Sequence, residues 1–454
     1  MQIVIAGAGK YGRTLAGELV AEGHDITIFE KNEEWFEDIM EEFDLSGVVG
    51  NAASYATQIE AGVDKCHAFL AMTGSDEINL IASIVAQSIG AEKTIARVVN
   101  PDYSPPSPVF RQNLGIGALI NPNLESAKEI MRMLRYPSAI SVESFFRGRV
   151  HIVAVRVPEE SILAGMKLLD FKRQCGEDLM VSVIRRDGEV FIPDSSSAIF
   201  DGDTIHVTGK VDALQNFYEH TNTVAPKIKN VMITGGGAIA YWLLGLMNKQ
   251  RYSVKLIERD RSIAELVYQR YPWVDVIRAD GTDQRVLEES NIQHYDAFIS
   301  LTGIDEENVL ASWVASHKGV QKTITKINRT RLLDILSESD LQNILTPHHI
   351  VSDEIVRAIR ALDNSQGSSV EALYRFEEGR VEALEFVAHP QSKVIGKTLL
   401  ELDLRSQLRL ACIVRGQEII FPGGQDQVLA GDRVIVVATG KRIYDLDDIL
   451  GGRD

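Results

Sequence analysis

The chain has 454 residues, of which 45% are hydrophobic and 24% charged, and its formal net charge is −17. This length exceeds one ordinary hydrophobic core and predicts three or four domains. An acidic surface does not attract the phosphates of nucleic acids, so no nucleic-acid partner is expected. The scattered cysteines Cys66, Cys175 and Cys412 form no CxxC pair and favour neither a disulfide framework nor a zinc site.

Strand-like and helix-like segments alternate from the start of the chain. Strand patterns lie at 2–6, 25–30, 47–49, 68–72 and 94–99, and helical patterns at 11–22, 33–43 and 76–90. Short strands alternating with helices of this length predict an α/β domain with a doubly wound parallel sheet. The longest apolar runs, such as 241–247, fall far short of the roughly 18 residues that span a bilayer. We therefore expect a cytoplasmic protein.

The second half of the chain repeats the first. Residues 3–12 (IVIAGAGKYG) align with 231–240 (VMITGGGAIA), and 68–79 (AFLAMTGSDEIN) align with 297–308 (AFISLTGIDEEN). Each unit of this kind is followed by a smaller, strand-rich module with turn signals such as FDGD and LAGD. We predict four domains, namely two Rossmann-like doubly wound domains over 1–140 and 226–362, each followed by a small α+β domain, over 141–225 and 363–454.

Three glycines follow the first strand. Gly7, Gly9 and Gly12 have the GxGxxG spacing, in which the first allows a tight turn, the second admits a phosphate and the third lets the helix pack. Glu30 ends the second strand, where a carboxylate accepts hydrogen bonds from a ribose diol and repels a 2′-phosphate. The pattern predicts a site for NAD, ATP or ADP rather than NADP. The alternative is a doubly wound domain that has kept the turn and lost the ligand.

Two arginines, a threonine and a glycine of the first half also lie where they could contact the nucleotide. Arg13 follows the last glycine and Arg97 ends the fifth strand, so both could reach phosphates at the carboxyl edge of the sheet. For Arg13 the alternative is a solvated residue in the first helical turn. Thr73 and Gly74 end the fourth strand, where a backbone and a hydroxyl can touch a cofactor.

The second glycine loop differs in charge. Gly235 and Gly237 are kept and Ala240 takes the third position, but Tyr241 stands in place of Arg13 and Lys326 in place of Arg97. Glu258 and the segment that begins at Thr302 remain. We expect a second site that is weaker, or that takes a different nucleotide.

Two nucleotide-binding units, each followed by a small domain and each carrying TGxDExN after the fourth strand, resemble the TrkA family of potassium uptake proteins, whose modules are RCK domains. The resemblance covers essentially the whole chain. It implies a homo-oligomeric ring, expected to be tetrameric, that lies on the inner face of the cell membrane beneath a potassium-translocating subunit. It also implies that NAD(H) or ATP/ADP binding changes the ring's shape and so gates transport.

The family's nucleotide contacts carry over by position. Asn51 departs from the pattern, because the family has an acid there, as this chain has at Asp280. In the first half the contacts are Gly7, Ala8, Gly9, Lys10, Tyr11, Glu30, Thr73, Gly74 and Arg97, and in the second half they are Gly235, Gly236, Gly237, Ala238, Ile239, Glu258 and Asp280.

Two other functions remain open. An NAD-dependent oxidoreductase needs a substrate domain with a proton-transfer group beside the nicotinamide, and the scattered histidines and the lack of a nucleophile-and-base set do not support one. A nucleotide sensor that regulates a different partner would share every motif described. We therefore expect a regulatory protein and not an enzyme.

Overall fold

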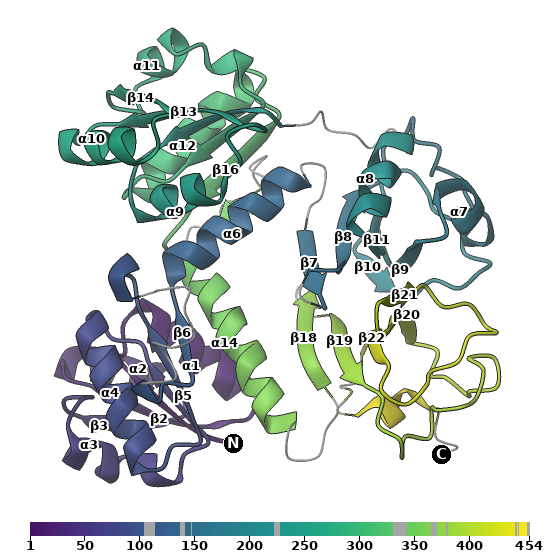
Figure 1. Ribbon diagram of the computed structural model, residues 1–454, viewed down its shortest axis with the longest axis horizontal. Coiled ribbons are helices and arrows are strands. Elements are labelled where there is room, and N and C mark those ends of the chain that lie inside the picture. The colour runs from purple at the N-terminus through teal and green to yellow at the C-terminus, as the bar shows by residue number, and fades with distance from the viewer. Residues whose placement is uncertain are drawn as a thin grey trace. The chain divides into compact units, whose positions relative to one another are not determined.

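The computed structural model describes residues 1–103, 114–136, 141–146, 148–221, 228–329, 343–364, 370–377, 380–440, 443 and 445–451. The chain divides into two compact units. Unit 1 holds residues 1–134 and 228–359, and unit 2 holds residues 135–227 and 360–454. Each unit therefore combines a segment from each half of the sequence (Figure 1).

The first domain of unit 1 is a parallel six-stranded sheet in the order β3-β2-β1-β4-β5-β6. Its order reverses at β1, which pairs with both β2 and β4. The central strands are buried along almost their whole length, as expected of a parallel sheet with helices on both faces. The strands are β1 (Gln2–Ala6), β2 (Asp25–Glu30), β3 (Ser46–Val49), β4 (Ala68–Ala71), β5 (Lys93–Arg97) and β6 (Ala118–Ile120), and the helices are α1 (Lys10–Ala21), α2 (Glu33–Glu42), α3 (Tyr55–Glu60) and α4 (Asp76–Ile89).

The second domain of unit 1 repeats this topology, with the order β14-β13-β12-β15-β16-β17. The predicted doubly wound fold is thus confirmed in both halves. The strands are β12 (Asn230–Thr234), β13 (Ser253–Glu258), β14 (Asp275–Arg278), β15 (Ala297–Ser300), β16 (Lys322–Lys326) and β17 (Ile344–Leu345), and the helices are α9 (Ala238–Leu246), α10 (Arg261–Arg270), α11 (Gln284–Glu289) and α12 (Asp305–His317).

The last helix of each domain packs on the other domain. On α6 (Pro122–Arg135), Ala127, Ile130 and Leu134 belong to the hydrophobic core that surrounds β12 and α9. On α14 (Pro347–Asn364), the Ser352 hydroxyl donates to a Glu18 carboxylate oxygen of α1 at 2.8 Å. The two domains therefore exchange helices, and α14 extends just past the boundary expected at 362.

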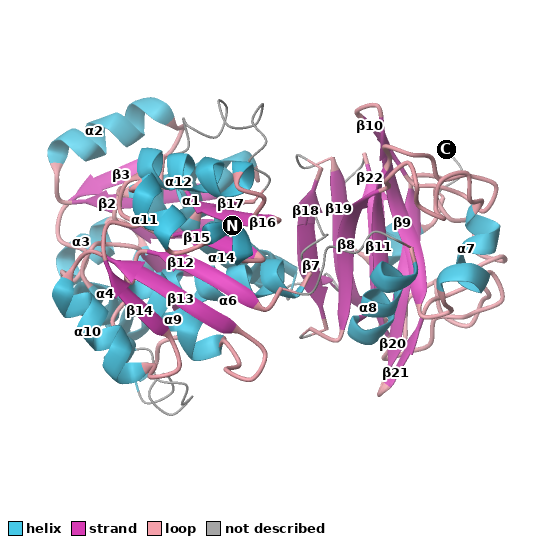
Figure 2. Cartoon of the chain, turned by 90° about the horizontal axis from the view of Figure 1, so that it is seen from above, coloured by secondary structure: helices cyan, strands magenta, loops and turns pink. Residues whose placement is uncertain are grey.

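Unit 2 contains two antiparallel five-stranded sheets, in the orders β10-β9-β11-β8-β7 and β18-β19-β22-β20-β21 (Figure 2). The predicted small α+β fold is confirmed for the first sheet, which carries two helices. Its elements are β7 (Ser141–Phe145), β8 (Val150–Arg156), α7 (Leu168–Cys175), β9 (Leu179–Arg186), β10 (Glu189–Phe191), β11 (Thr204–Lys210) and α8 (Val211–His220). The second sheet holds β18 (Val370–Phe376), β19 (Val381–Val387), β20 (Leu408–Arg415), β21 (Glu418–Ile420) and β22 (Arg433–Thr439).

Both sheets of unit 2 carry the same ion pair between an arginine and a buried aspartate. Arg186 donates to both carboxylate oxygens of Asp203 at 2.8 Å, and Arg415 donates to those of Asp432 at 3.0 and 2.8 Å. Each aspartate also accepts from a backbone N–H of its own turn, and its side chain is only 1–2% exposed. The FDGD and LAGD turns thus supply the carboxylates that bind Arg186 and Arg415 in the two sheets. Across the described residues, no helix is long and apolar enough to cross a membrane.

Candidate functional site

The fold itself requires two of the three glycines in the first loop. Gly7 has φ +108°, and a Cβ there would stand 3.1 Å from the backbone of Met72. A Cβ on Gly12 would stand 1.8 Å from the carbonyl oxygen of Gly7, so α1 can approach the loop only without a side chain at this position. These two glycines bring the start of α1 close to the ends of β1 and β4.

Gly9 and Gly74 have no such structural need. Gly9 has ordinary extended angles (φ −67°, ψ −176°), and a Cβ there would meet only the Trp35 ring, at 3.9 Å. A Cβ on Gly74 would meet nothing within 4 Å. A Cβ on the matching Gly237 or Gly303 would also meet nothing within 4 Å. Glycine at these four places leaves room that the protein does not fill, which fits a ligand lying against the backbone.

The helices that follow these loops lack a side-chain cap. Gly9 and Gly237 are the N-cap residues of α1 and α9, and a glycine has no side-chain oxygen to accept from the first amides. The neighbouring α2 and α4 are capped by Asn32 and Ser75, which accept from Trp35 and Ile78 amides. An uncapped helix N-terminus beside an open glycine is a ready site for a phosphate.

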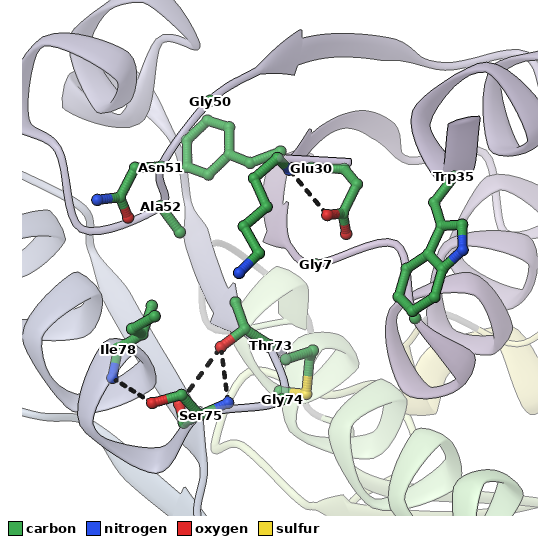
Figure 3. Close-up of a pocket in the computed structure, with 14 residues that line it drawn as sticks. Gly7, Glu30, Trp35, Gly50, Asn51, Ala52, Thr73, Gly74, Ser75 and Ile78 are labelled. Atoms are coloured by element: carbon green, nitrogen blue, oxygen red, sulfur yellow. Dashed lines mark hydrogen bonds between the residues drawn. The ribbon is translucent and has the colours of Figure 1, made fainter. Parts of the chain in front are cut away.

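A cavity of about 300 Å³ opens at the carboxyl edge of the first sheet (Figure 3). It lies where the strand order reverses between β1 and β4, which is where open α/β sheets hold ligands. Its walls come from the glycine loop, the end of β2, the turn after β3 and the turn after β4. The lining residues are Gly7, Gly9, Phe29, Glu30, Lys31, Trp35, Gly50, Asn51, Ala52, Met72, Thr73, Gly74, Ser75 and Ile78.

Glu30 connects the glycine loop to the segment that follows β2. One carboxylate oxygen accepts from the Ala8 N–H at 2.8 Å, and the other accepts from the Lys31 and Asn32 N–H groups at 2.8 and 2.9 Å. Glu258 repeats the arrangement, accepting from the N–H groups of Gly236 and Asp260 at 2.6 and 2.7 Å. Each carboxylate therefore holds its glycine loop against the end of the neighbouring strand.

The predicted residues divide into those that line a cavity and those that support one. Gly7, Gly9, Glu30, Asn51, Thr73 and Gly74 line the first cavity, whereas Ala8, Lys10, Tyr11, Gly12, Arg13 and Arg97 do not. A second cavity of about 340 Å³ occupies the matching place in the second domain. Gly235, Gly237, Glu258, Asp280 and Thr302 line it, whereas Gly236, Ala238, Ile239 and Lys326 do not.

The two arginines expected at the phosphates have other partners. Arg13 donates to a Glu42 carboxylate oxygen of α2 at 2.8 Å, so its charge is held against that helix. Arg97 donates to the Thr73 carbonyl oxygen at 2.8 Å, and its guanidinium lies 4.7 Å from the centre of the Tyr11 ring. Arg97 therefore supports the wall of the first cavity from behind.

Asn51 and the matching Asp280 form the same local turn. The Asn51 side-chain oxygen accepts from the Ala53 N–H at 3.0 Å, and Asp280 accepts from the Thr282 N–H at the same distance. The Thr282 hydroxyl donates to Asp280 as well, at 2.7 Å, and lowers the pKa of that carboxyl. The departure changes the charge at this place and leaves the loop unchanged.

Asn79 and Asn308 support the cavity walls, and motif reading did not single them out. The Asn79 side-chain oxygen accepts from the Thr73 hydroxyl at 2.7 Å, and its amide donates to the Arg97 carbonyl oxygen at 2.8 Å. Asn308 makes the same contacts with Thr302 and Lys326, at 2.7 and 3.0 Å. The shared TGxDExN spacing was the available signal, and it sets the turn that forms one cavity wall.

The polar side chains in the two linings are carboxylates, hydroxyls, an amide and one cationic side chain in each cavity. Neither lining contains a histidine or a cysteine. The described parts of the chain contain no group of three metal-ligating side chains. Backbone amides beside the Glu30 or Glu258 carboxylate suit a nucleotide, and the residues present therefore fit the expected ligand.

Two families of known domains match most of the chain. The TrkA-N domain family matches residues 3–122 and 231–347, and the TrkA-C domain family matches 152–222 and 383–451. The chain is 31% identical over 452 residues to the Trk system potassium uptake protein TrkA homolog of Archaeoglobus fulgidus, covering 99% of this chain and all of that protein. It is 28% identical to the Trk system potassium uptake protein TrkA of Haemophilus influenzae, covering 97% of this chain and 96% of that one.

The fold also resembles that of a solved channel structure. The GsuK channel bound to NAD matches 96% of this chain and 76% of its own, with a TM-score of 0.61 at 18% identity. At this identity the likeness concerns the fold, and it extends over both units.

Proposed function

The chain belongs to the TrkA family, and on this basis we propose that it is the nucleotide-binding regulatory subunit of a membrane potassium uptake system. Its ligands are NAD(H), ATP or ADP. The observation that carries the proposal is the pair of glycines, Gly9 and Gly74, that keep space open over an uncapped helix N-terminus, repeated at Gly237 and Gly303.

Each part of the first cavity has a distinct task. The amides at the start of α1 hold phosphate, with Gly9 permitting close approach. The Glu30 carboxylate, already fixed by three backbone N–H groups, presents its remaining lone pairs to a ribose diol. A bound nucleotide adds negative charge to the cavity. It also contacts both the loop after β1 and the turn after β4 and so connects them.

Regulation follows from differential affinity. A nucleotide biases the gate only as far as it binds one conformation of the protein more tightly than another. The exchange of α6 and α14 means that a loop movement in one domain acts on a helix of the other. We propose that a homotetrameric ring of such subunits lies on the cytoplasmic face of the membrane and transmits this movement to the potassium-translocating partner.

Binding is tested by titrating the full chain with NAD, NADH, ATP and ADP in a calorimeter, with NADP as the contrast. Gly9→Asp places a carboxylate where phosphate binds, and Gly237→Asp does the same in the second cavity. Each variant should lose one class of sites and serve as the control for the other. If none of the four ligands binds the wild-type protein, the proposal fails.

Regulation needs a separate experiment. The full chain is reconstituted with a Trk-type membrane protein in vesicles, and potassium flux is measured with and without nucleotide. We expect the Gly9→Asp, Gly237→Asp double variant to bind the vesicles and lose the nucleotide response. Steady oxidation of NADH by the protein alone would favour the oxidoreductase instead, and a response of a different partner would favour the alternative sensor.

A further inference from the structure

The two cavities differ at one matched position in their walls. Trp35 is the third residue of α2 and Ile263 is the third residue of α10, and both line their cavities. Their backbones are held alike, since the Trp35 N–H donates to Asn32 at 3.0 Å and the Ile263 N–H donates to Asp260 at 3.1 Å. The difference between the cavities at this point is therefore one of side chain only.

The position of Trp35 is that of a ligand contact. Its ring is the one neighbour of the open space over Gly9, and Figure 3 shows it on the same side of the cavity as Glu30. The side chain is 50% exposed, although a large apolar ring gains free energy from burial. A ligand that lies on Gly9 and reaches Glu30 with its ribose passes along this indole and covers it.

A second matched pair changes the charge of the walls. Ile78 is the third residue of α4 and lines the first cavity, and Glu307 is the third residue of α12 and lines the second. The second lining also includes Asp260, whereas the matched Asn32 does not line the first cavity. Carboxylates near a phosphate site repel an anionic ligand, so the second cavity is the less favourable one for a nucleotide.

We propose that Trp35 contacts the adenosine half of the nucleotide and makes the first cavity the tight site of the chain. Ile263 and Glu307 make the second cavity the weak site. This inference rests on the proposed function and adds to it the residue that sets the inequality between the two sites. An aromatic face stabilises a base or a ribose that packs on it, and an isoleucine offers less area.

The test uses ADP, which has the adenosine half and no nicotinamide, on the full chain. Tryptophan emission and calorimetry are followed in the wild type, in Trp35→Ile and in the conservative Trp35→Phe. Trp35→Ile should weaken the tight site about tenfold and remove the ADP-dependent change in emission, and Trp35→Phe should keep most of the affinity. NAD, which shares the adenosine half, should lose the same factor.

The reciprocal variant Ile263→Trp should tighten the weak site and add a second change in emission. Because the Trp35 side chain is half exposed, the thermal midpoint without ligand should stay constant in Trp35→Ile, which separates a contact role from a folding role. Unchanged ADP affinity in Trp35→Ile overturns this inference and leaves the proposed function intact. A loss confined to NAD overturns it too, because the contact would then be with the nicotinamide half, and a wild type that binds no nucleotide overturns both.

Discussion

The imidazole of His348 stands edge-on to the ring of Tyr11, with ring centroids 6.5 Å apart and an interplanar angle of 88°. Tyr11 lies in the first turn of α1, and His348 lies in the first turn of α14, which belongs to the other half of the sequence. Arg97 packs on the same tyrosine and holds the Thr73 carbonyl at the wall of the first cavity. A continuous set of contacts thus connects the first cavity to the exchanged helix.

The contact between Tyr11 and His348 should be measurable as a coupling energy. In a double-mutant cycle with Tyr11→Ala and His348→Ala, we expect about 1 kcal/mol of interaction in the free energy of unfolding. Urea denaturation of the four proteins gives this value. The matched control pairs His348→Ala with Tyr268→Ala, whose exposed side chain lies on α10, and those effects should simply add. Equal coupling in both cycles would contradict the assignment.

His348 should also give the fold a dependence on pH. Burial lowers the pKa of His348 to about 4, because it disfavours the charged ring, whereas an unfolded histidine titrates near 6.5. Below pH 6.5 the unfolded chain therefore binds the proton first. The neutral, buried His348 therefore contributes fully to the free energy of unfolding above pH 6.5, and this contribution is lost as the pH falls towards 4.

Between pH 7 and pH 4 the free energy of unfolding should fall by about 3 kcal/mol less in His348→Phe than in the wild type. Urea titrations at several pH values measure it, with His294→Phe, at an exposed histidine, as the control. The adjacent His349 acts in the opposite direction, because its hydrogen bond to Glu18 raises its pKa. Parallel pH profiles for wild type and His348→Phe would refute the prediction.

Glu30 should stabilise the nucleotide-free protein as well as contact the ligand. In Glu30→Gln, an amide NH₂ replaces one of the two oxygens that accept from backbone N–H groups, so at least one buried donor loses its partner. The expected cost is about 1–3 kcal/mol in the free energy of unfolding without nucleotide. Glu42→Gln, at an exposed carboxylate that pairs with Arg13, should cost less than about 1 kcal/mol. Equal losses of unfolding free energy in Glu30→Gln and Glu42→Gln would show that Glu30 does not stabilise the glycine loop.

The ion pairs of unit 2 should be stronger than surface pairs, because their aspartates are buried. Asp203→Ala removes the partner of Arg186 and leaves a Phe200 N–H without its acceptor, which should cost about 2 kcal/mol in the free energy of unfolding. Asp432→Ala should behave alike in the other sheet. Asp170→Ala, which breaks an exposed pair with Arg173, should cost less than about 1 kcal/mol by thermal unfolding. A similar small cost at Asp203 would contradict the structure.

Local features were predictable because they depend on neighbours in sequence. Strand and helix periodicity placed β1 to β5 and both glycine loops, and the internal repeat identified two domains of each kind. The turn at Asp203 could be recognised from FDGD. The partners of Arg13 and Arg97 could not, because a charged side chain near a phosphate loop can equally meet a carboxylate such as Glu42 or a carbonyl such as that of Thr73.

The helix exchange was also beyond sequence reading. The apolar positions Ala127, Ile130 and Leu134 on α6 indicate that one face is buried, and they do not say which core covers it. Trp35 was missed for a related reason. An exposed aromatic in a first helical turn matches no motif, and its meaning appears only when Gly9 is found beside it.

The exchange of α6 and α14 has a practical consequence for dissecting the chain. A cut after residue 221 leaves the N-terminal fragment with a helix whose apolar side has lost its cover, and leaves the C-terminal fragment with β12 and α9 lacking that helix. Neither fragment is a natural folding unit, so titrations on isolated halves would report on damaged proteins. The two fragments, when produced together, should instead associate and restore each other's fold. The affinity between them then measures how much each half depends on the other.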